Sequence, residues 1–244
     1  MLNVNIIILK TAFSVNRLNI FSAKFDYLCY TQIMTKAEIR KEIKARIAAL
    51  PASELKAQSD ALCKKIISSD NYTCCDVLLA YMPLADEADI TPLISHALEH
   101  NKEVYLPRIT PGTNQMEFYR YEAADQTAPG SFGITEPLAD EARNFLRLAD
   151  SAAAAPAPQS CPKILMLVPG RAFTKDGRRL GRGKGFYDIY FSRLAACPFY
   201  ADIKKSGVCL ACQLVADLPV TPDDVVMDSV VSPGSTTDLT ISEE

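Results

Sequence analysis

Residues 76–106 contain an apolar run, a helical pattern and a second apolar run, in that order. No other feature of the sequence constrains the fold as strongly. Residues 76–82 and 103–106 have the character of buried strands. Between them a helix is expected to open at Thr91 and Pro92, with proline at the first helical position, where its missing N–H is tolerated. A strand, a helix and a strand within about thirty residues form a βαβ unit. The chain is therefore expected to contain a parallel sheet.

The segment 178–188 combines glycines, cationic side chains and the start of a further helix at Phe186. Its glycines carry no Cβ, so the backbone is free to adopt positive φ and bring successive N–H groups against a ligand. The helix adds unpaired N–H groups and the positive end of its dipole. Together these properties favour a bound anion. The segment supplies Arg178, Arg179, Gly181, Arg182, Gly183, Lys184 and Gly185.

The surroundings of this segment favour a ligand site over a solvated loop. The apolar run 164–168 precedes it, and a strand, a loop and a helix in that order are typical of ligand sites in open α/β sheets. The pattern is not a Walker P-loop, because Gly185 follows Lys184 where Ser or Thr is required. A flexible basic loop and an arginine–glycine contact to RNA remain as alternatives. The net charge of −3 argues against the RNA alternative.

Acidic residues accompany the glycine segment and two other turns. Asp188 falls in the first turn of the helix, near a bound phosphate but of the wrong charge to touch it. Magnesium resolves this conflict, because it binds through one or two carboxylates together with phosphate oxygens. Residues 86–89 follow the carboxyl end of a strand, and residues 223–228 hold a third acidic group. A solvated loop or a turn cap would also explain these last two groups.

Residues 35–50 predict an amphipathic helix. Thr35 and Glu38 have the spacing of a capping box, which satisfies backbone donors at a helix start. Apolar residues recur at helical intervals and predict one buried stripe, while basic residues at intervals of four line a second face. The buried stripe is Ile39, Ile43, Ile47 and Leu50, and the basic face is Lys36, Arg40 and Lys44.

The cysteines and histidines are expected to be structural. Eight cysteines lack the density of a disulfide scaffold, which favours reduced thiols in the cytosol. Cys209 and Cys212 lie in an apolar, strand-like run without a second pair at zinc spacing, so we expect them in the core. The two histidines, His96 and His100, are expected on the exposed face of a helix.

The regular patterns begin at Met34, so residues 34–234 are expected to form one domain. Residues 1–33 contain an apolar run too short to span a bilayer and no clear cleavage site. We interpret them as a poorly ordered extension or a misplaced start, with an unusual targeting segment as the alternative. Residues 139–162 are rich in Ala, Pro and Ser and are expected to be an insertion loop. Residues 235–244 are expected to be a C-terminal tail.

Several of these segments together resemble the 5-formyltetrahydrofolate cyclo-ligases, also called methenyltetrahydrofolate synthetases. The resemblance runs from Lys36 to about Val230, and residues 167–174 and 179–188 carry most of it. Supporting matches are Lys36, Arg40, Tyr81, Met82, Asp86, Glu87 and the segments 106–108, 132–137 and 219–224.

The resemblance implies a three-layer α/β/α fold around a mostly parallel sheet. It also implies ATP-dependent closure of 5-formyltetrahydrofolate to 5,10-methenyltetrahydrofolate, with magnesium and with release of ADP and phosphate. In that reaction the formyl oxygen attacks the γ-phosphate, and the neighbouring amine nitrogen then attacks the formyl carbon and displaces phosphate. Such a transfer needs positioning and charge neutralisation and no protein nucleophile.

The resemblance also implies roles for individual positions. Lys184 and Arg182 are the expected catalytic residues, and Asp188 and Asp224 the expected magnesium ligands. Phe186 stands where many members have Tyr, which removes a hydroxyl but keeps the ring. The expected ATP contacts are Lys36, Arg40, Arg179, Leu180, Gly181, Arg182, Gly183, Lys184, Gly185, Phe186 and Tyr187. The expected folate contacts are Met82, Glu87, Arg182, Gly183, Lys184, Gly185 and Phe186.

The expected partners are ATP and the formylated folate, without nucleic acid or membrane. The protein is expected to be a cytoplasmic monomer or weak homodimer. A nucleotide- or folate-binding module without turnover is the second interpretation, and binding of ATP without product would favour it.

Overall fold

The computed structural model describes residues 34–122, 127–130, 133–148, 162–197, 200–219, 221 and 224–238. The expected extension 1–33 lies outside the described residues. So do residues 149–161 of the expected insertion and residues 239–244 of the expected tail. None of the helices in the described ranges is long and apolar enough to cross a membrane.

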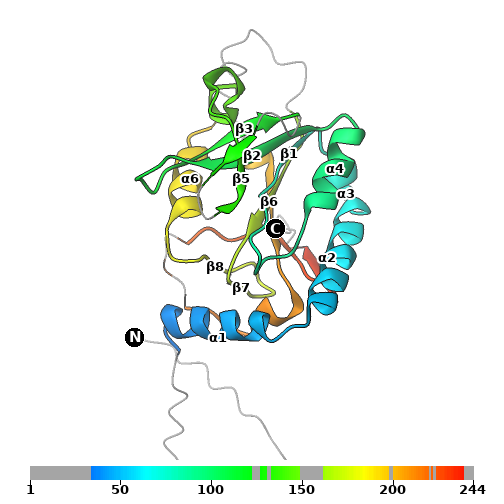
Figure 1. Cartoon of the computed structure of the whole chain (residues 1–244), viewed down its shortest axis with the longest axis vertical. Helices are drawn as coiled ribbons and strands as arrows, with labels where there is room; N and C mark the ends of the chain where they lie inside the picture. The colour runs from blue at the N-terminus through cyan, green and yellow to red at the C-terminus, as the bar shows by residue number, and fades with distance from the viewer. Residues whose placement is uncertain are drawn as a thin grey trace, which may run out of the picture. The chain divides into compact units, whose positions relative to one another are not determined.

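Within the described residues, seven strands form one mixed sheet in the order β11-β10-β9-β6-β1-β2-β3 (Figure 1). The five strands from β10 to β2 are parallel to their neighbours, and β11 and β3 pair antiparallel at the two edges. The predicted parallel sheet is therefore confirmed. The strands are β1 (Val77–Leu79), β2 (Glu103–Ile109), β3 (Met116–Tyr121), β6 (Ile164–Pro169), β9 (Ile203–Val208), β10 (Ser229–Val231) and β11 (Thr236–Asp238).

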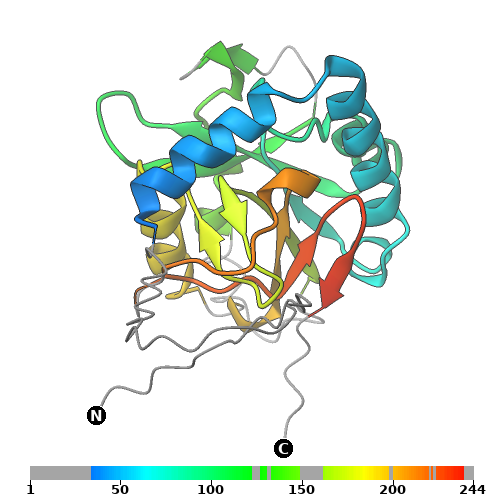
Figure 2. The same cartoon turned by 90° about the horizontal axis from the view of Figure 1, so that it is seen from below.

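Helices cover both faces of this sheet (Figures 1 and 2). Leu78 and Leu165 face a core shared with α1, α2, α3 and α4, whereas Leu79 and Met166 face a second core shared with α6. Adjacent strand residues point to opposite faces, so apolar runs such as β6 are buried on both sides. The three-layer α/β/α arrangement is confirmed. The helices are α1 (Lys36–Ala48), α2 (Ala52–Ile67), α3 (Asp70–Thr73), α4 (Thr91–Glu99) and α6 (Phe186–Leu194).

The predicted features of α1 are present. Thr35 and Glu38 form the capping box, and Ile39, Ile43 and Ile47 are buried. The buried stripe packs into the core beside the sheet, and Arg40 of the second face bonds to Gly181 of the glycine segment. The beginning of α6 at Phe186 was also predicted correctly.

Other local expectations were wrong. The segment 170–180 contains the short hairpin β7 (Ala172–Phe173) and β8 (Arg179–Leu180), so β6 does not pass by a simple loop into the glycine segment. The strand-like run that contains Cys209 and Cys212 is not one strand: β9 ends at Val208, and a 3-10 turn occupies Ala211–Gln213. In the expected tail, Thr236–Asp238 forms β11. A further hairpin pairs β4 (Thr127–Pro129) with β5 (Thr135–Pro137).

Candidate active site

A cavity of about 320 Å³ lies beside the carboxyl ends of the parallel strands β1 and β6. Its walls come from the segments that follow these two strands, from β2 and β3, and from the glycine segment before α6. The predicted residues that line it are Met82, Glu87, Arg179, Gly181, Arg182, Gly183, Lys184, Gly185, Phe186, Tyr187 and Asp188. Lys36, Arg40, Leu180 and Asp224 are not among its lining residues.

The backbone of the glycine segment takes the conformation that its sequence requires. Gly183 has φ +91° and Gly185 has φ +76°, a region that side chains with a Cβ rarely adopt. Gly185 is also the N-cap of α6 and provides no side-chain cap for the first turn. The start of α6 therefore presents its N–H groups and the positive end of its dipole beside the cavity.

Helix α1 contacts the glycine segment and a second turn. Arg40 Nε donates to the carbonyl oxygen of Gly181 at 2.8 Å. Lys36 Nζ lies 2.8 Å from Asp224 Oδ2, and this oxygen also accepts from the N–H of Thr221. Burial raises the pKa of Asp224, but the bonds from Lys36 and Thr221 outweigh this effect and lower the pKa. Lys36 and Asp224 are thus brought together as an ion pair.

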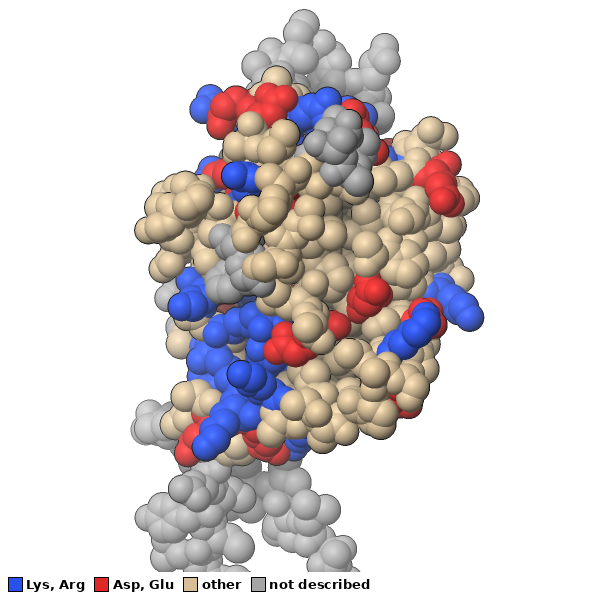
Figure 3. Space-filling model, viewed as in Figure 1, with Lys and Arg blue, Asp and Glu red and all other residues tan. Residues whose placement is uncertain are grey.

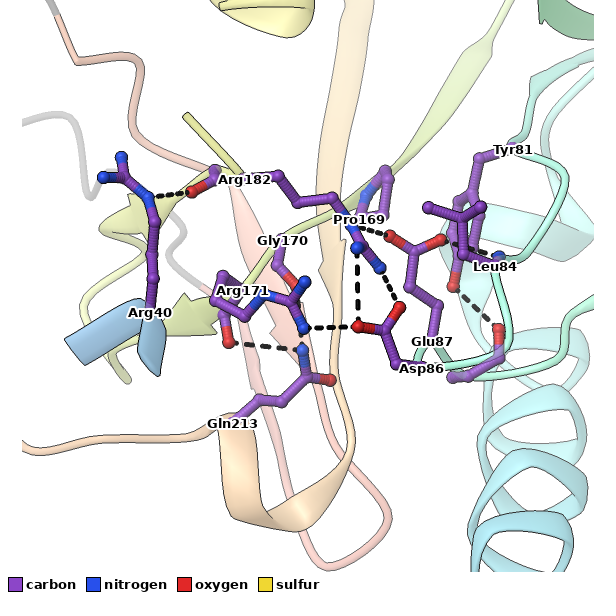
Figure 4. A network of polar contacts seen from close by, with 12 residues as sticks. Arg40, Tyr81, Leu84, Asp86, Glu87, Pro169, Gly170, Arg171, Arg182 and Gln213 are labelled. Atoms are coloured by element: carbon purple, nitrogen blue, oxygen red, sulfur yellow. Dashed lines mark hydrogen bonds and ion pairs between the residues drawn. The ribbon is translucent and has the colours of Figure 1, made fainter. Parts of the chain in front are cut away.

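Arg182 crosses the cavity to the segment that follows β1 (Figure 4). Its Nε donates to Glu87 Oε1 at 2.8 Å, and its terminal nitrogens bond to both oxygens of Asp86. Glu87 is only 8% exposed, and its Oε2 accepts from the Leu84 N–H at 3.0 Å. Burial lowers the pKa of Arg182, but the two carboxylates outweigh it and raise the pKa. Arg182 therefore stays charged and fixes the orientation of Glu87.

Arg179 is held under the start of α6. Its Nε donates to the carbonyl oxygen of Pro169 at 3.0 Å, and its Nη1 lies 3.2 Å from Asp188 Oδ1. The guanidinium also lies 5.1 Å from the ring centroid of Tyr187, a cation–π contact. Burial raises the pKa of the Tyr187 phenol well above its usual range, so this side chain stays neutral.

Lys184 differs from the other cations of the site. Its side chain is exposed, and within the described part of the chain no carboxylate forms an ion pair with it. Figure 3 shows lysine and arginine side chains gathered over the region where Figure 1 places β8 and the beginning of α1. Lys184 is thus available to a mobile anion without first breaking an ion pair.

The two expected metal ligands are not combined into one preformed cluster. Among the described residues, no group of three or more His, Cys, Asp or Glu side chains is arranged to hold a metal. Asp188 lines the cavity with its side chain 58% exposed, whereas Asp224 lies outside the lining with Lys36. Exposed carboxylate oxygen suits magnesium, which takes its remaining ligands from phosphate and water. Asp188 thus offers the cavity a carboxylate that fits magnesium, and Asp224 would have to leave Lys36 to join it.

Sequence reasoning gave no role to Arg171 or Gln213, although Arg171 lies inside the motif that carried the resemblance. Arg171 is 7% exposed, and its Nη1 donates to Asp86 Oδ2 at 2.7 Å. Gln213 Nε2 donates to the carbonyl oxygen of Gly170 at 2.8 Å. The available signal in the sequence was an arginine two residues after a strand with a wholly apolar sequence, because a buried arginine needs a charged or polar partner.

The remaining candidates lie elsewhere. His96 is half-buried, not exposed as expected, because its Nδ1 bonds to the Tyr72 hydroxyl at 2.7 Å. Its ring stacks on His100. Cys209 is buried in the core, as predicted, and burial raises the pKa of its thiol to about 12. Cys212 is half-buried, and neither cysteine is in a disulfide. The acidic turn residue Asp223 lies outside the described residues.

Comparisons with known proteins cover most of this chain and agree with its fold. The 5-formyltetrahydrofolate cyclo-ligase family matches residues 32–233. A probable 5-formyltetrahydrofolate cyclo-ligase of Caenorhabditis elegans is 31% identical, over 82% of this chain and 94% of its own length. The 5-formyltetrahydrofolate cyclo-ligase of Mus musculus is 29% identical, over 80% of this chain and 92% of its own.

A solved structure gives the same result. The 5,10-methenyltetrahydrofolate synthetase of Aquifex aeolicus superposes with a TM-score of 0.68 at 26% identity, over 86% of this chain and 96% of that chain. The family match and these similarities cover nearly all of the described residues. The chain therefore belongs to the 5-formyltetrahydrofolate cyclo-ligase family.

Proposed function

We propose that this protein closes 5-formyltetrahydrofolate to 5,10-methenyltetrahydrofolate and converts ATP to ADP and phosphate. Membership of the family supports this reaction. The observation that carries it here is a single cavity lined both by the glycine segment before α6 and by the buried carboxylate of Glu87. Such a cavity offers one wall to phosphates and another to the hydrogen-bond donors of a pterin.

The triphosphate is assigned to the glycine segment. Among the lysines and arginines that line the cavity in the described part of the chain, Lys184 is the one without a carboxylate ion pair, and we assign it to neutralise charge on the transferred phosphoryl group. Arg182, although paired with Asp86 and Glu87, is assigned to the reacting centre because it crosses the same cavity. The remaining proposed ATP contacts are Lys36, Arg40, Arg179, Leu180, Gly181, Gly183, Gly185, Phe186 and Tyr187.

The folate is assigned to the opposite wall. Met82 supplies an apolar surface, and Glu87 supplies carboxylate oxygens for the amino and ring N–H donors of the pterin. With both substrates bound, the formyl oxygen attacks the γ-phosphate. The neighbouring amine nitrogen then attacks the formyl carbon, and the phosphate leaves with the former formyl oxygen. Residues 182–186 are proposed to contact both substrates.

Magnesium is proposed as the metal, with Asp188 and Asp224 as its protein ligands. When bound, the ion supplies positive charge to the phosphate oxygens. Asp188 would exchange its contact with Arg179, and Asp224 its contact with Lys36, for the metal. We further propose a cytoplasmic monomer or weak homodimer that binds neither nucleic acid nor membrane.

Turnover by the purified protein tests this function. The ultraviolet absorbance of 5,10-methenyltetrahydrofolate is expected to rise only when 5-formyltetrahydrofolate, ATP and magnesium are all present. ADP is expected to form in a one-to-one ratio with that product. Binding of ATP without product would instead favour the non-catalytic interpretation.

A further inference from the structure

Asp86 bridges two arginines that come from different parts of the chain (Figure 4). Its Oδ2 accepts from Arg171 Nη1 at 2.7 Å, and its Oδ1 accepts from Arg182 Nη2. Arg171 lies two residues after the end of β6, whereas Arg182 belongs to the glycine segment. One carboxylate of the segment after β1 thus fixes two other walls of the cavity.

The contacts continue on both sides of Asp86. On one side, Gln213 Nε2 donates to the carbonyl oxygen of Gly170, and the N–H of Arg171 donates to the carbonyl oxygen of Leu180 at 2.7 Å. These bonds hold the backbone from which the Arg171 side chain extends. On the other side, Arg182 holds Glu87 Oε1. A continuous series of contacts therefore connects the turn at Ala211–Gln213 with the carboxylate of Glu87, which lines the cavity.

The positive and negative charges of these connected side chains are equal in number. Two carboxylates, Asp86 and Glu87, face two guanidinium groups, those of Arg171 and Arg182. Arg171 is 7% exposed, so its charge depends on Asp86 for compensation. Arg182 uses its Nε and both terminal nitrogens on carboxylates, which fixes its plane as well as its position.

From this geometry we infer that Asp86 and Arg171 are positioning residues that hold Arg182, and through it Glu87, in the orientation that binds the folate. The inference rests on the proposed function for the identity of the ligand. It assigns Asp86 chiefly to folate binding, because the bonded series ends at Glu87, which is proposed to contact the folate alone. Lys184 and Arg40, which make no bond to Asp86, are expected to keep their positions when Asp86 is changed.

Asp86→Asn removes the charge and leaves one carbonyl oxygen for two arginines. The KM for 5-formyltetrahydrofolate is expected to rise about tenfold, the effect of losing a bond between charged groups. The KM for ATP is expected to change less than the KM for the folate, because Asp86 bonds to Arg182 but not to the other proposed ATP contacts Lys36 and Arg40. Asp217→Asn is the matched control: Asp217 is exposed and pairs with Arg178 outside the cavity lining, so its removal is expected to leave both constants unchanged.

A purely structural role for Asp86 predicts a different result. Asp86→Asn would then reduce the folded, active fraction, so that kcat falls while both KM values stay constant. Adding Arg171→Gln removes the buried charge that Asp86 compensates. If the folate KM of Asp86→Asn rises only because the Arg171 charge is left unpaired, the double variant Asp86→Asn with Arg171→Gln would recover the wild-type KM for folate. We expect it to recover thermal stability but to retain the raised folate KM.

Calorimetric binding of 5-formyltetrahydrofolate without ATP completes the test. The dissociation constant is expected to rise about tenfold in Asp86→Asn and in the double variant, but not in Asp217→Asn. Unchanged binding in Asp86→Asn, or full recovery in the double variant, overturns the inference. A wild-type protein that binds the folate without product formation contradicts the proposed function alone, while one that does not bind it contradicts both.

Discussion

Arg40, on the first helix of the described domain, donates a hydrogen bond from its Nε to the carbonyl oxygen of Gly181, 141 residues later in the chain. A Cβ built on Gly183 would lie 3.3 Å from Arg40 Cζ, so the guanidinium also packs against the second glycine. The glycine segment is thus positioned by α1 as well as by the strand and helix that flank it.

Arg40→Ala is therefore expected to weaken ATP binding. The segment loses a bond from a charged donor, so the KM for ATP is expected to rise about tenfold while the KM for folate changes little. Initial rates at varied ATP measure the effect. Lys41→Ala, which changes an exposed residue of the same helix, serves as the control. An unchanged ATP KM in Arg40→Ala would refute the assignment of α1 to the nucleotide.

Lys184→Ala is expected to reduce kcat by about 100- to 1,000-fold, the usual effect of losing one group that stabilises charge in the transition state. Because Lys184 is exposed, the thermal unfolding midpoint of the Lys184→Ala variant is expected to equal that of the wild type. Rates at saturating substrate and a thermal melt provide the two measurements. Lys204→Ala, another exposed lysine, controls for the loss of charge. A near-normal kcat in Lys184→Ala would contradict the proposed catalytic role of Lys184.

Asp188→Asn tests the proposed metal ligand. It is expected to raise the magnesium concentration for half-maximal activity by at least about tenfold. Arg179 also loses its partner, so a titration at fixed, saturating ATP is needed to separate metal from nucleotide binding. Asp217→Asn provides an exposed aspartate that also pairs with an arginine. Equal magnesium dependence in the wild type and Asp188→Asn would exclude Asp188 as a ligand.

Gly207→Ala is expected to destabilise the fold. A Cβ at Gly207 would lie 2.5 Å from Cε1 of Phe173, whose ring is fully buried. Overpacking of this kind costs about 1–3 kcal/mol, which urea unfolding would detect. Gly234→Ala is the matched control, because no atom lies within 4 Å of its added Cβ. Equal unfolding free energies for the two variants would show that the Phe173 ring moves aside.

The stability due to Asp86 is expected to depend on pH. Burial raises the pKa of Asp86, but Arg182 and Arg171 outweigh burial and lower the pKa below its ordinary value of 3.8. The charged form is therefore favoured by folding, so its contribution is complete above that value and is lost as the pH falls below it. Urea unfolding of the wild type and Asp86→Asn should give a difference that shrinks in this acid range. A constant difference would contradict the charge pairing.

The sequence predicted those parts of the fold that depend on local periodicity. The predictions of the capping box at Thr35, the buried strand β6 and the start of α6 at Phe186 were correct. Each of these features is specified by residues that are close together in the sequence. The hairpin of β7 and β8 was missed, since strands of two residues are too short to show a period.

The candidate site was predictable as a set of residues but not as a set of contacts. The glycines and cations of segment 178–188 predicted an anion site, and all of them except Arg178 line the cavity with Glu87. The pairing of Asp86 with Arg171 and Arg182 spans 85 and 96 residues of sequence. Such pairs form only where the sheet brings distant loops together, so spacing alone could not reveal which acids meet which arginines.

The most direct test of the proposed reaction follows an oxygen atom. If the γ-phosphate is transferred to the formyl oxygen, 5-formyltetrahydrofolate labelled with a heavy oxygen isotope in its formyl group must deliver that label to the released phosphate. Mass spectrometry of the phosphate after turnover by the purified protein is expected to show the label in each molecule formed. Unlabelled phosphate, with the heavy isotope recovered in water, would contradict the account.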